Sequence, residues 1–398
     1  MNVFVISLGC PKNLTDTEVL MGQLAASGHK IIASEKEADF FIINTCAFLK
    51  AARDEVKETI KELKKYKKEI YLAGCYPVWC RRFSVPLKGV AGVIDTIGLH
   101  SYQIPRIKAT PPWTAYIKIS EGCGNKCSYC MIPIIRGKLK IRKTQDILEE
   151  AKQLAKKGVK EIIYIAQDTT AHPKLPDILQ KTAKIKGIHW IRIMYANPAH
   201  ITEKLIKIIK LEPKIVKYID LPLQHISDKI LKLMNRAQIN GQGIRNLVER
   251  LRRKIPGIAI RTSFIVGFPT ETEKDFEELF DFVKEMKFER VGCFKFSKED
   301  GTPASKMRGQ VPEKIKSYRF QKLMLLQKKV SKELNQNLVG KYLEVLYEGS
   351  GLARTPMDAP EIDCSVCLGN ANLSPGEFAK IKITNSKSYE LTGRLYCT

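Results

Sequence analysis

The 398-residue chain lacks two kinds of segment that would place it in a membrane or outside the cell. It contains no run of about 18 apolar residues, so we expect no transmembrane helix and no membrane partner. Its first residues, MNVFVISLGCPKN, have no basic start and a short apolar run, unlike a secretory signal. The cysteine count is odd, at 11. In a reducing compartment clustered cysteines more often hold metal than form disulfides, and we expect a cytoplasmic protein.

The stretch EGCGNKCSYC lacks a fourth metal ligand. It places Cys123, Cys127 and Cys130 at the spacing Cys-x3-Cys-x2-Cys, and we name these three residues the loop cysteine set. A closed structural zinc site needs four donors, usually as two close pairs. A 4Fe-4S cluster also normally takes four thiolates, and a cluster held by three leaves one iron open. We favour this open cluster over three unrelated thiols or a zinc site completed from a distance.

The formal net charge is +25, from 67 Lys and Arg against 42 Asp and Glu. Such an excess favours an anionic partner, with nucleic acid or a ribonucleoprotein as the first candidate. Much of the lysine is spread through helical segments such as KELKKYKK, which is also typical of a solvated helix face. Charge therefore indicates RNA contact through a basic surface, with simple solvation as the alternative.

Three apolar, strand-like runs in the first hundred residues each end on a cysteine. VFVISLGC ends on Cys10, FFIINTC on Cys46 and IYLAGC on Cys75, and helical patterns separate them. Alternating strands and helices predict a parallel sheet, in which the carboxyl ends of the strands share one edge. We name Cys10, Cys46 and Cys75 the sheet cysteine set and expect it to hold a second open cluster. Buried structural cysteines are the alternative, and Cys80 is interpreted as a spare thiol.

Six strand candidates alternate with helices from residue 114 onward, at 115–120, 160–168, 189–197, 217–224, 258–267 and 290–297. This rhythm predicts a partial (β/α)6 barrel of parallel strands, shorter than the closed eight-stranded form. Polar residues near strand ends, such as Gln167, Asp168 and His225, would face the same mouth as the loop cysteine set. Helix caps and turns are the alternative role for each of them.

The chain as a whole is predicted to be α/β with four segments: an N-terminal parallel α/β domain at 1–100, a linker at 101–113, the partial barrel at 114–337 and a small antiparallel β-barrel at 338–398. Proline and a lack of periodicity indicate the linker. The last segment contains Cys364 and Cys367 in CSVC, which we interpret as incidental thiols because no second pair accompanies them.

These motifs together resemble the radical S-adenosylmethionine methylthiotransferases over essentially the whole chain. The terminal barrel is then of the TRAM type. The stretches most similar to the RimO branch are ISLGCPKNLTDTE, EGCGNKCSYCMIPIIRGK, AQDTT, LPLQHISDKILKLMNR, FSKEDGTPA and DAPEID. That branch inserts a methylthio group at the beta carbon of an aspartate in ribosomal small-subunit protein twelve. The alternatives are the relative that modifies a transfer RNA adenosine beside the anticodon and, in another class, a non-catalytic RNA-binding protein with metal-stabilised domains.

The resemblance implies two 4Fe-4S clusters, S-adenosylmethionine and an electron donor. The loop cysteine set would hold the cluster whose free iron binds S-adenosylmethionine, and the sheet cysteine set the cluster that carries the sulfur. Positions that match cofactor contacts of the family are Tyr129, Gln167, Asp168, Arg192, Ile265 and Gly267. Thr270 and Cys364 stand where similar proteins usually show glycine.

Overall fold

The computed structural model describes residues 1–396 as two compact units. The first unit contains residues 1–174 with 297–305, and the second contains residues 175–296 with the chain from 306 onward. Residues 397 and 398, which belong to the predicted C-terminal segment, lie outside the described part. Every helix within residues 1–396 is too short or too polar to cross a lipid bilayer.

The first unit begins with a five-stranded parallel sheet in the order β2-β1-β3-β4-β5. The strands are β1 (Asn2–Ser7), β2 (Lys30–Ile32), β3 (Phe40–Thr45), β4 (Glu69–Gly74) and β5 (Gly92–Ile94). The central strand β3 is buried along its whole length, as expected for a parallel strand with both faces covered. The three longer strands are those that the sequence predicts. The short edge strands β2 and β5 were not predicted, because neither lies in a long apolar run.

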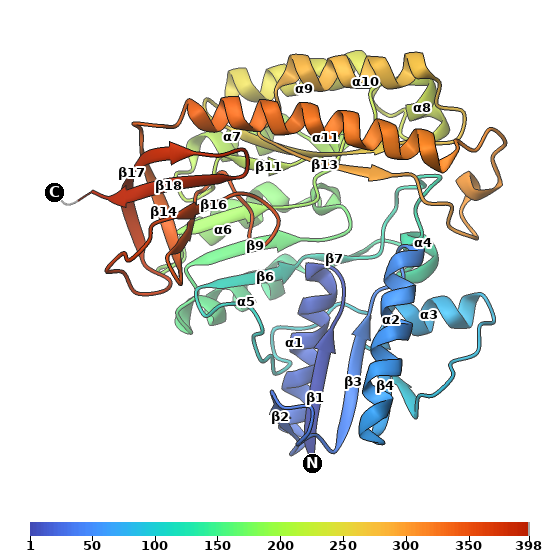
Figure 1. Cartoon of the computed structure of the whole chain (residues 1–398). Coiled ribbons are helices and arrows are strands. Elements are labelled where there is room, and N and C mark those ends of the chain that lie inside the picture. The colour runs from blue at the N-terminus through green and yellow to red at the C-terminus, as the bar shows by residue number, and fades with distance from the viewer. Residues whose placement is uncertain (397–398) are drawn as a thin grey trace. The chain divides into compact units, whose positions relative to one another are not determined.

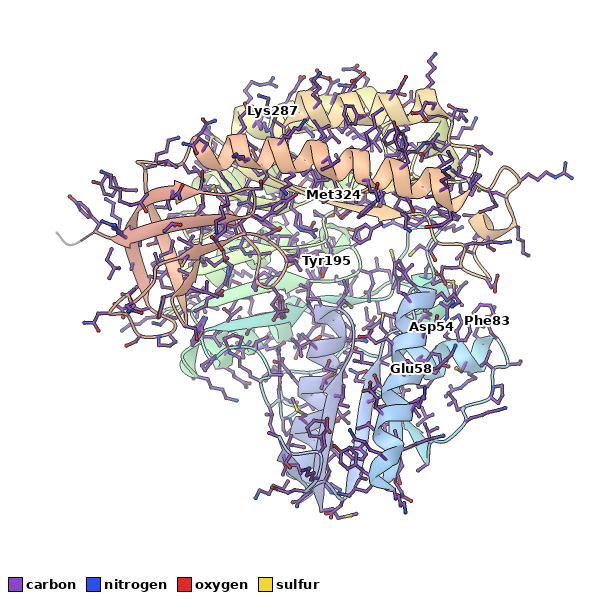
Figure 2. All side chains as sticks on the ribbon, in the orientation of Figure 1. Asp54, Glu58, Phe83, Tyr195, Lys287 and Met324 are labelled. Atoms are coloured by element: carbon purple, nitrogen blue, oxygen red, sulfur yellow. The ribbon has the colours of Figure 1, made fainter. Side chains whose placement is uncertain are left out.

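Three helices cover the two faces of this sheet: α1 (Pro11–Ala26), α2 (Lys50–Leu63) and α3 (Cys75–Arg82), as Figure 1 shows. Alternate residues of β3 point to opposite faces. Phe40 and Ile42 pack with Leu20 of α1, whereas Phe41 belongs to the core formed by α2 and α3. The outer face of α2 is polar, and there Asp54 pairs with lysines on the preceding and following turns (Figure 2).

The remainder of the first unit contains β6 (Thr114–Lys118), β7 (Ser120–Glu121), α4 (Ile132–Ile135), β8 (Lys140–Ile141), α5 (Thr144–Lys156) and β9 (Glu161–Ile165). Strands β6 and β9 pair in parallel, and β7 pairs with β8 in antiparallel fashion. The linker is irregular in structure and lies directly against α1. A methyl group added at Gly22 would stand 2.1 Å from the carbonyl oxygen of Pro105, and the Ile107 N–H donates to the Glu18 carbonyl at 3.0 Å.

The second unit contains the later strands of the predicted partial barrel and the helices between them. These are α6 (Leu175–Ala183), β10 (Trp190–Ile193), α7 (Glu203–Leu211), β11 (Tyr218–Asp220), α8 (Asp228–Leu233), α9 (Gly241–Lys254), β12 (Ala259–Val266), α10 (Glu273–Met286), β13 (Arg290–Lys295) and α11 (Glu313–Gln336). Strands β11, β12 and β13 pair in parallel in that order. All six predicted strands are therefore present as β6 and β9 to β13, and each is shorter than its apolar run.

A small closed barrel ends the chain, formed by β14 (Tyr342–Gly349), β15 (Leu352–Arg354), β16 (Ser365–Cys367), β17 (Phe378–Ser386) and β18 (Glu390–Leu395). The strand order around the ring is β14-β15-β16-β18-β17. Figure 1 shows this barrel at the C-terminal end of the chain. The sequence predicts a wholly antiparallel barrel, but β16 and β18 pair in parallel. A closed ring with an odd number of strands cannot alternate in direction all the way round, so one parallel pair is required.

Candidate functional site

The sheet cysteine set lies at the carboxyl edge of three adjacent parallel strands. Cys10 caps the start of α1 after β1, Cys46 directly follows β3, and Cys75 opens α3 immediately after β4. Two glycines with positive φ permit these close approaches. A methyl group on Gly9 (φ +104°) would stand 2.8 Å from Cβ of Cys46, and one on Gly74 (φ +81°) would stand 2.2 Å from the side-chain oxygen of Asn44. The local backbone thus brings three thiols together.

A buried arginine, Arg136, lies beside this set. It belongs to the stretch EGCGNKCSYCMIPIIRGK, in which only the cysteines and Tyr129 were predicted to have a role. Nε of Arg136 lies 3.4 Å from Sγ of Cys75, and its Nη1 lies 3.2 Å from Oδ2 of Asp16 and 3.0 Å from Oε2 of Glu121. Lys118 pairs with the same two carboxylates. All four charged side chains are almost fully buried, so solvent screens their interactions little.

The pKa values of the three thiols in the sheet cysteine set are shifted from the ordinary cysteine value in different directions. Burial raises the pKa of a thiol, but the charges of Lys12 and Arg136 and hydrogen bonds from backbone N–H groups more than offset burial at Cys10, whose pKa is lowered. Burial dominates at the other two cysteines: it raises the pKa of Cys46, and it raises the pKa of Cys75 to about 12. Because the thiolate is the metal-binding form, loading this set must displace protons from Cys46 and Cys75.

The loop cysteine set lies between β7 and α4. The Cys130 N–H donates to the Cys127 carbonyl at 3.1 Å, and the Cys123 N–H donates to the Gly137 carbonyl at 3.2 Å, which fixes the loop in a tight turn. Tyr129 lies in the same loop. Burial raises the pKa of the Cys123 thiol, and the nearby charge of Asp168 adds to that increase. All three cysteines are partly exposed, unlike Cys75.

Gln167 and Asp168 follow β9 and lie near the loop cysteine set. Nδ2 of Asn125, within the loop, donates to Oδ2 of Asp168 at 2.7 Å, and Nε2 of Gln167 donates to Oε1 of Glu121 at 3.0 Å. Asp168 also accepts from the backbone N–H of Ala171 at 3.1 Å, as the cap of a short 3-10 turn. Asp168 therefore has the capping role considered from the sequence and also holds the cysteine loop through Asn125, which sequence reasoning missed.

The other three predicted cofactor contacts belong to the second unit, whereas both cysteine sets belong to the first. Arg192, on β10, is buried over the ring of Tyr218 and donates to the carbonyl of Pro356 at 3.0 Å. Ile265 lies on β12, and the N–H of Gly267 donates to Oε1 of Glu271 at 2.9 Å. Their contact with a cofactor stays a prediction.

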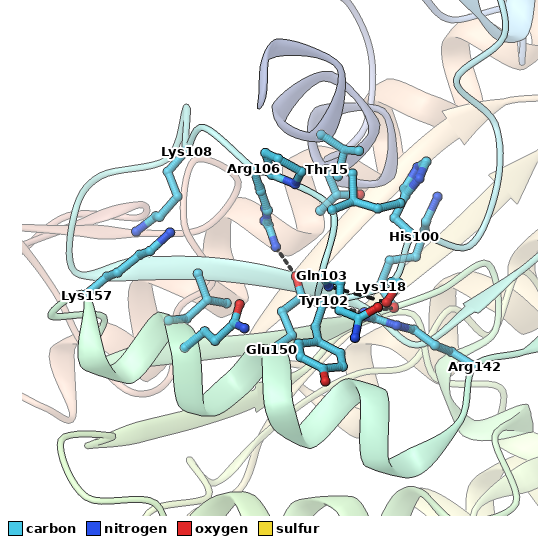
Figure 3. A pocket seen from close by; sticks show the side chains of 16 residues that line it. Thr15, His100, Tyr102, Gln103, Arg106, Lys108, Lys118, Arg142, Glu150 and Lys157 are labelled. Carbon is cyan, nitrogen blue, oxygen red and sulfur yellow. Dashed lines mark hydrogen bonds and ion pairs between the residues drawn. The ribbon is translucent and has the colours of Figure 1, made fainter. Parts of the chain in front are cut away.

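A cavity of 380 Å³ in the first unit lies between the linker, α1 and α5, and cysteine is absent from the side chains that line it (Figure 3). Arg106 and Glu150 form an ion pair at its wall, and Lys118 and Arg142 also face it. Lys108 and Lys157 also line it. The cavity thus borders the buried charges next to the sheet cysteine set and is separate from the thiols themselves.

Within residues 1–396, no group of three or more Cys, His, Asp or Glu side chains is arranged to hold a metal ion as it stands. A 4Fe-4S cluster makes a different demand, because each of its thiolate ligands binds a separate iron. The donor chemistry of the sheet cysteine set fits such a group. Its three thiols interact electrostatically with one another, and the fixed cation of Arg136 would offset the negative charge that thiolates bring.

Family models match three segments of the chain. The Radical SAM superfamily matches residues 117–283, the TRAM domain matches residues 339–395, and the family described as Uncharacterized protein family UPF0004 matches residues 2–82. The first two matches agree with the fold class that the sequence predicts, including the small terminal barrel.

Several relatives match over the full length. Proteins named ribosomal protein uS12 methylthiotransferase RimO are 42% identical in Pelotomaculum thermopropionicum and 43% identical in Elusimicrobium minutum, with 99% of both chains covered in each case. The protein of that name from Geobacter sulfurreducens is 40% identical, over 99% of this chain and 98% of its own. A solved radical S-adenosylmethionine methyltransferase, TsrM from Kitasatospora setae, is 12% identical with a TM-score of 0.55, covering 94% of this chain and 83% of its own. That likeness concerns the fold.

Proposed function

The chain belongs to the RimO family of ribosomal protein uS12 methylthiotransferases, and we propose that it inserts a methylthio group at the beta carbon of an aspartate in that ribosomal protein. The observation that carries this proposal is the match at about 40% identity along the whole of both chains. The transfer RNA substrate is not favoured, because these full-length relatives are all named for uS12. The expected place of the reaction is the cytoplasm, where ribosomes are found.

Two 4Fe-4S clusters and S-adenosylmethionine are the proposed cofactors. The loop cysteine set would hold one cluster and the sheet cysteine set the other, each with one iron left open to a non-protein ligand. When bound, these groups supply one-electron chemistry strong enough to break an unactivated C–H bond. An external electron donor and contact of the basic surface with ribosomal RNA complete the proposed partners.

The protein's own residues position the ligands and limit access of water. Asn125 ties the cysteine loop to Asp168 at the end of β9, so that the loop is held to a rigid strand. The buried Met131 and Ile135 follow the loop cysteine set and pack into the core beneath the sheet cysteine set. We also propose that the chain is divided by role into residues 1–100, 114–337 and 338–398, with the linker between the first two and the last contributing to substrate recognition.

The test is a mass-spectrometric assay with anaerobically reconstituted protein, S-adenosylmethionine, sulfide and a reductant. Small ribosomal subunits and transfer RNA are offered in parallel. We expect a methylthio gain on an aspartate of uS12 and none on RNA. Cys127→Ala should abolish both this gain and the cleavage of S-adenosylmethionine, whereas Cys367→Ala, outside both cysteine sets, should retain them. A gain on a transfer RNA adenosine would contradict the proposed substrate, and cleavage by Cys127→Ala would contradict the cluster assignment.

A further inference from the structure

A short segment leads from the loop cysteine set to a residue beside the sheet cysteine set. Arg136 is six positions after Cys130, and α4 (Ile132–Ile135) lies between them. Met131 and Ile135 of this segment are buried in the same hydrophobic core as Cys75. Because close-packed interiors transmit displacement rather than absorb it, a shift of the cysteine loop would move Arg136 as well.

Arg136 is held in one orientation by partners on three sides. Its Nη1 contacts Asp16 and Glu121 at 3.2 and 3.0 Å, its Nη2 donates to the side-chain oxygen of Asn13, and its Nε lies 3.4 Å from Sγ of Cys75. Asn13 is itself fixed, since its Nδ2 donates to backbone carbonyls at both Leu8 and Thr45. The Arg136 side chain is 1% exposed, so its guanidinium is a permanent, weakly screened positive charge.

The four charged side chains that pair with one another around Arg136 balance before any thiol loses its proton. Asp16 and Glu121 supply two negative charges, and Arg136 and Lys118 supply two positive charges. An iron-sulfur group bound by three thiolates would add negative charge at this site. Lys118 faces the carboxylates, and the charge of Lys12 acts on Cys10. Nε of Arg136 points at Cys75, so the guanidinium is the cation placed to interact with the charge added at that thiolate.

We propose that Arg136 is the positioning residue and charge partner of the sheet cysteine set. The segment that follows the loop cysteine set would then also set the reduction potential of a cluster held by the sheet cysteine set. The inference rests on the proposed function, because it takes the sheet cysteine set to hold an iron-sulfur cluster. Reduction adds one negative charge to a cluster, and a fixed cation nearby stabilises the reduced form. Cluster potentials respond to nearby charge and to hydrogen bonds at sulfur, and both are supplied here by one side chain.

The test uses full-length protein in which Cys123, Cys127 and Cys130 are all replaced by alanine, so that only the sheet cysteine set can be loaded. Arg136→Gln and Arg136→Lys are made in this background. Iron content and the midpoint potential, from a redox titration followed by electron paramagnetic resonance, are measured for each. We expect Arg136→Gln to lower the potential and weaken cluster retention by roughly 10-fold. Arg136→Lys should restore most of the potential because it keeps the charge.

Arg53→Gln is the matched control. Arg53 is another buried arginine of the first unit, and its Nη1 pairs with Oε2 of Glu299 at 2.7 Å. It should leave the potential unchanged. If Arg136→Gln fails to fold, Arg136→Met takes its place as the variant without charge: a lowered potential supports the inference, and an unchanged potential overturns it. A loaded cluster whose potential is the same in Arg136→Gln overturns the inference alone, whereas no cluster in the background protein overturns the two-cluster assignment beneath it.

Discussion

Arg290 and Asp358 form a buried ion pair in which Nη2 of the arginine lies 2.6 Å from Oδ1 of the aspartate. Arg290 begins β13, and Asp358 lies in the turn between β15 and β16 of the C-terminal barrel. The aspartate also accepts from the Thr355 hydroxyl at 2.6 Å and from the Cys364 N–H at 3.2 Å. The DAPEID stretch, which the sequence offered as a mark of substrate class, therefore attaches the terminal barrel to the strands of its own unit.

Asp358→Asn should destabilise the second unit. The change would leave the buried guanidinium of Arg290 without its counter-charge, which typically costs about 3 kcal/mol or more. Urea unfolding followed by circular dichroism would measure the loss. Glu390→Gln removes one partner of an exposed pair with Lys387 and should give no measurable change. An unfolding free energy of Asp358→Asn equal to that of the unmodified protein would show that the pair contributes nothing net.

Thr270→Gly should stabilise the protein. Thr270 has φ +67°, in the left-handed region, which explains why similar proteins usually have glycine at this position. A non-glycine residue in that region costs about 1–2 kcal/mol, and the extra freedom of glycine in the unfolded chain returns about 0.5–1 kcal/mol. We expect a net gain of up to about 1 kcal/mol in denaturant unfolding.

A neighbouring threonine provides the control for this change. Thr272 caps α10, and its side chain accepts from the Asp275 N–H in a capping box. Thr272→Ala should therefore lose about 1 kcal/mol, the opposite sign. Equal effects of the two substitutions would show that the backbone conformation at Thr270 is not strained.

Gly74→Ala should impair iron retention by the sheet cysteine set. Gly74 precedes Cys75 at φ +81°, and a new methyl group would meet the side-chain oxygen of Asn44 at 2.2 Å. Gly28→Ala is the matched control, because Gly28 has φ +85° but no atom within 4 Å of the added carbon. Both variants place a side chain at a positive φ, and only Gly74→Ala adds a steric clash next to the cysteine. Iron content after anaerobic reconstitution distinguishes them, and equal loss in both variants would argue against a positional effect.

His172 should make the protein less stable in acid. Its Nε2 lies 3.0 Å from the Arg142 carbonyl, and its Nδ1 accepts from the Lys174 N–H at 3.2 Å, so the folded state holds a neutral ring. Burial lowers the pKa of His172 below its ordinary 6.5. Above that value both states are neutral and stability is complete. As the pH falls below it, the unfolded chain takes up a proton first, and stability declines through the folded pKa.

The size of this decline is about 1.4 kcal/mol for each unit that separates the folded and unfolded pKa values. Thermal melting at pH 7.5 and at pH 5 would measure this decline. Both values lie about one unit or more from the ordinary pKa of histidine. His172→Gln should flatten the difference between these two conditions, since glutamine does not titrate. The same pH dependence in His172→Gln would assign the acid sensitivity to other groups.

The sequence was informative about elements with a clear apolar period and about ligands of recognisable spacing. The runs ending on Cys10, Cys46 and Cys75 became β1, β3 and the β4–α3 junction, because a buried parallel strand needs a continuous apolar segment. Strands β2, β5, β15 and β16 have three residues each and, unlike the equally short β11, no longer apolar run around them that would show a period. The parallel pairing of β16 with β18 is required by the closed ring of five strands, and a local sequence pattern carries no information about ring closure.

The buried charges of the site were beyond sequence reasoning for another reason. Arg136, Asp16 and Glu121 are ordinary charged residues in the printed chain, and 120 positions separate the first two. Their burial is possible because each meets its partner in the folded unit, and pairing over such separations has no signature in spacing. Thr270 was predictable in part. The sequence shows threonine where similar proteins usually have glycine, but the left-handed backbone conformation at this position is known only from the structure.

The close contact of the linker with α1 has a consequence for unfolding. The backbone at Pro105 lies so close to Gly22 that no side chain would fit between them. Arg106 also pairs with both Glu18 and Glu150, so the linker is packed against the helices and is not a flexible connection. The sheet of residues 1–100 and the strands β6 and β9 then share one cooperative folding unit, in which neither part opens alone. The linker amides would exchange with solvent as slowly as those of the strands on either side, and proteases would find no early cleavage site there.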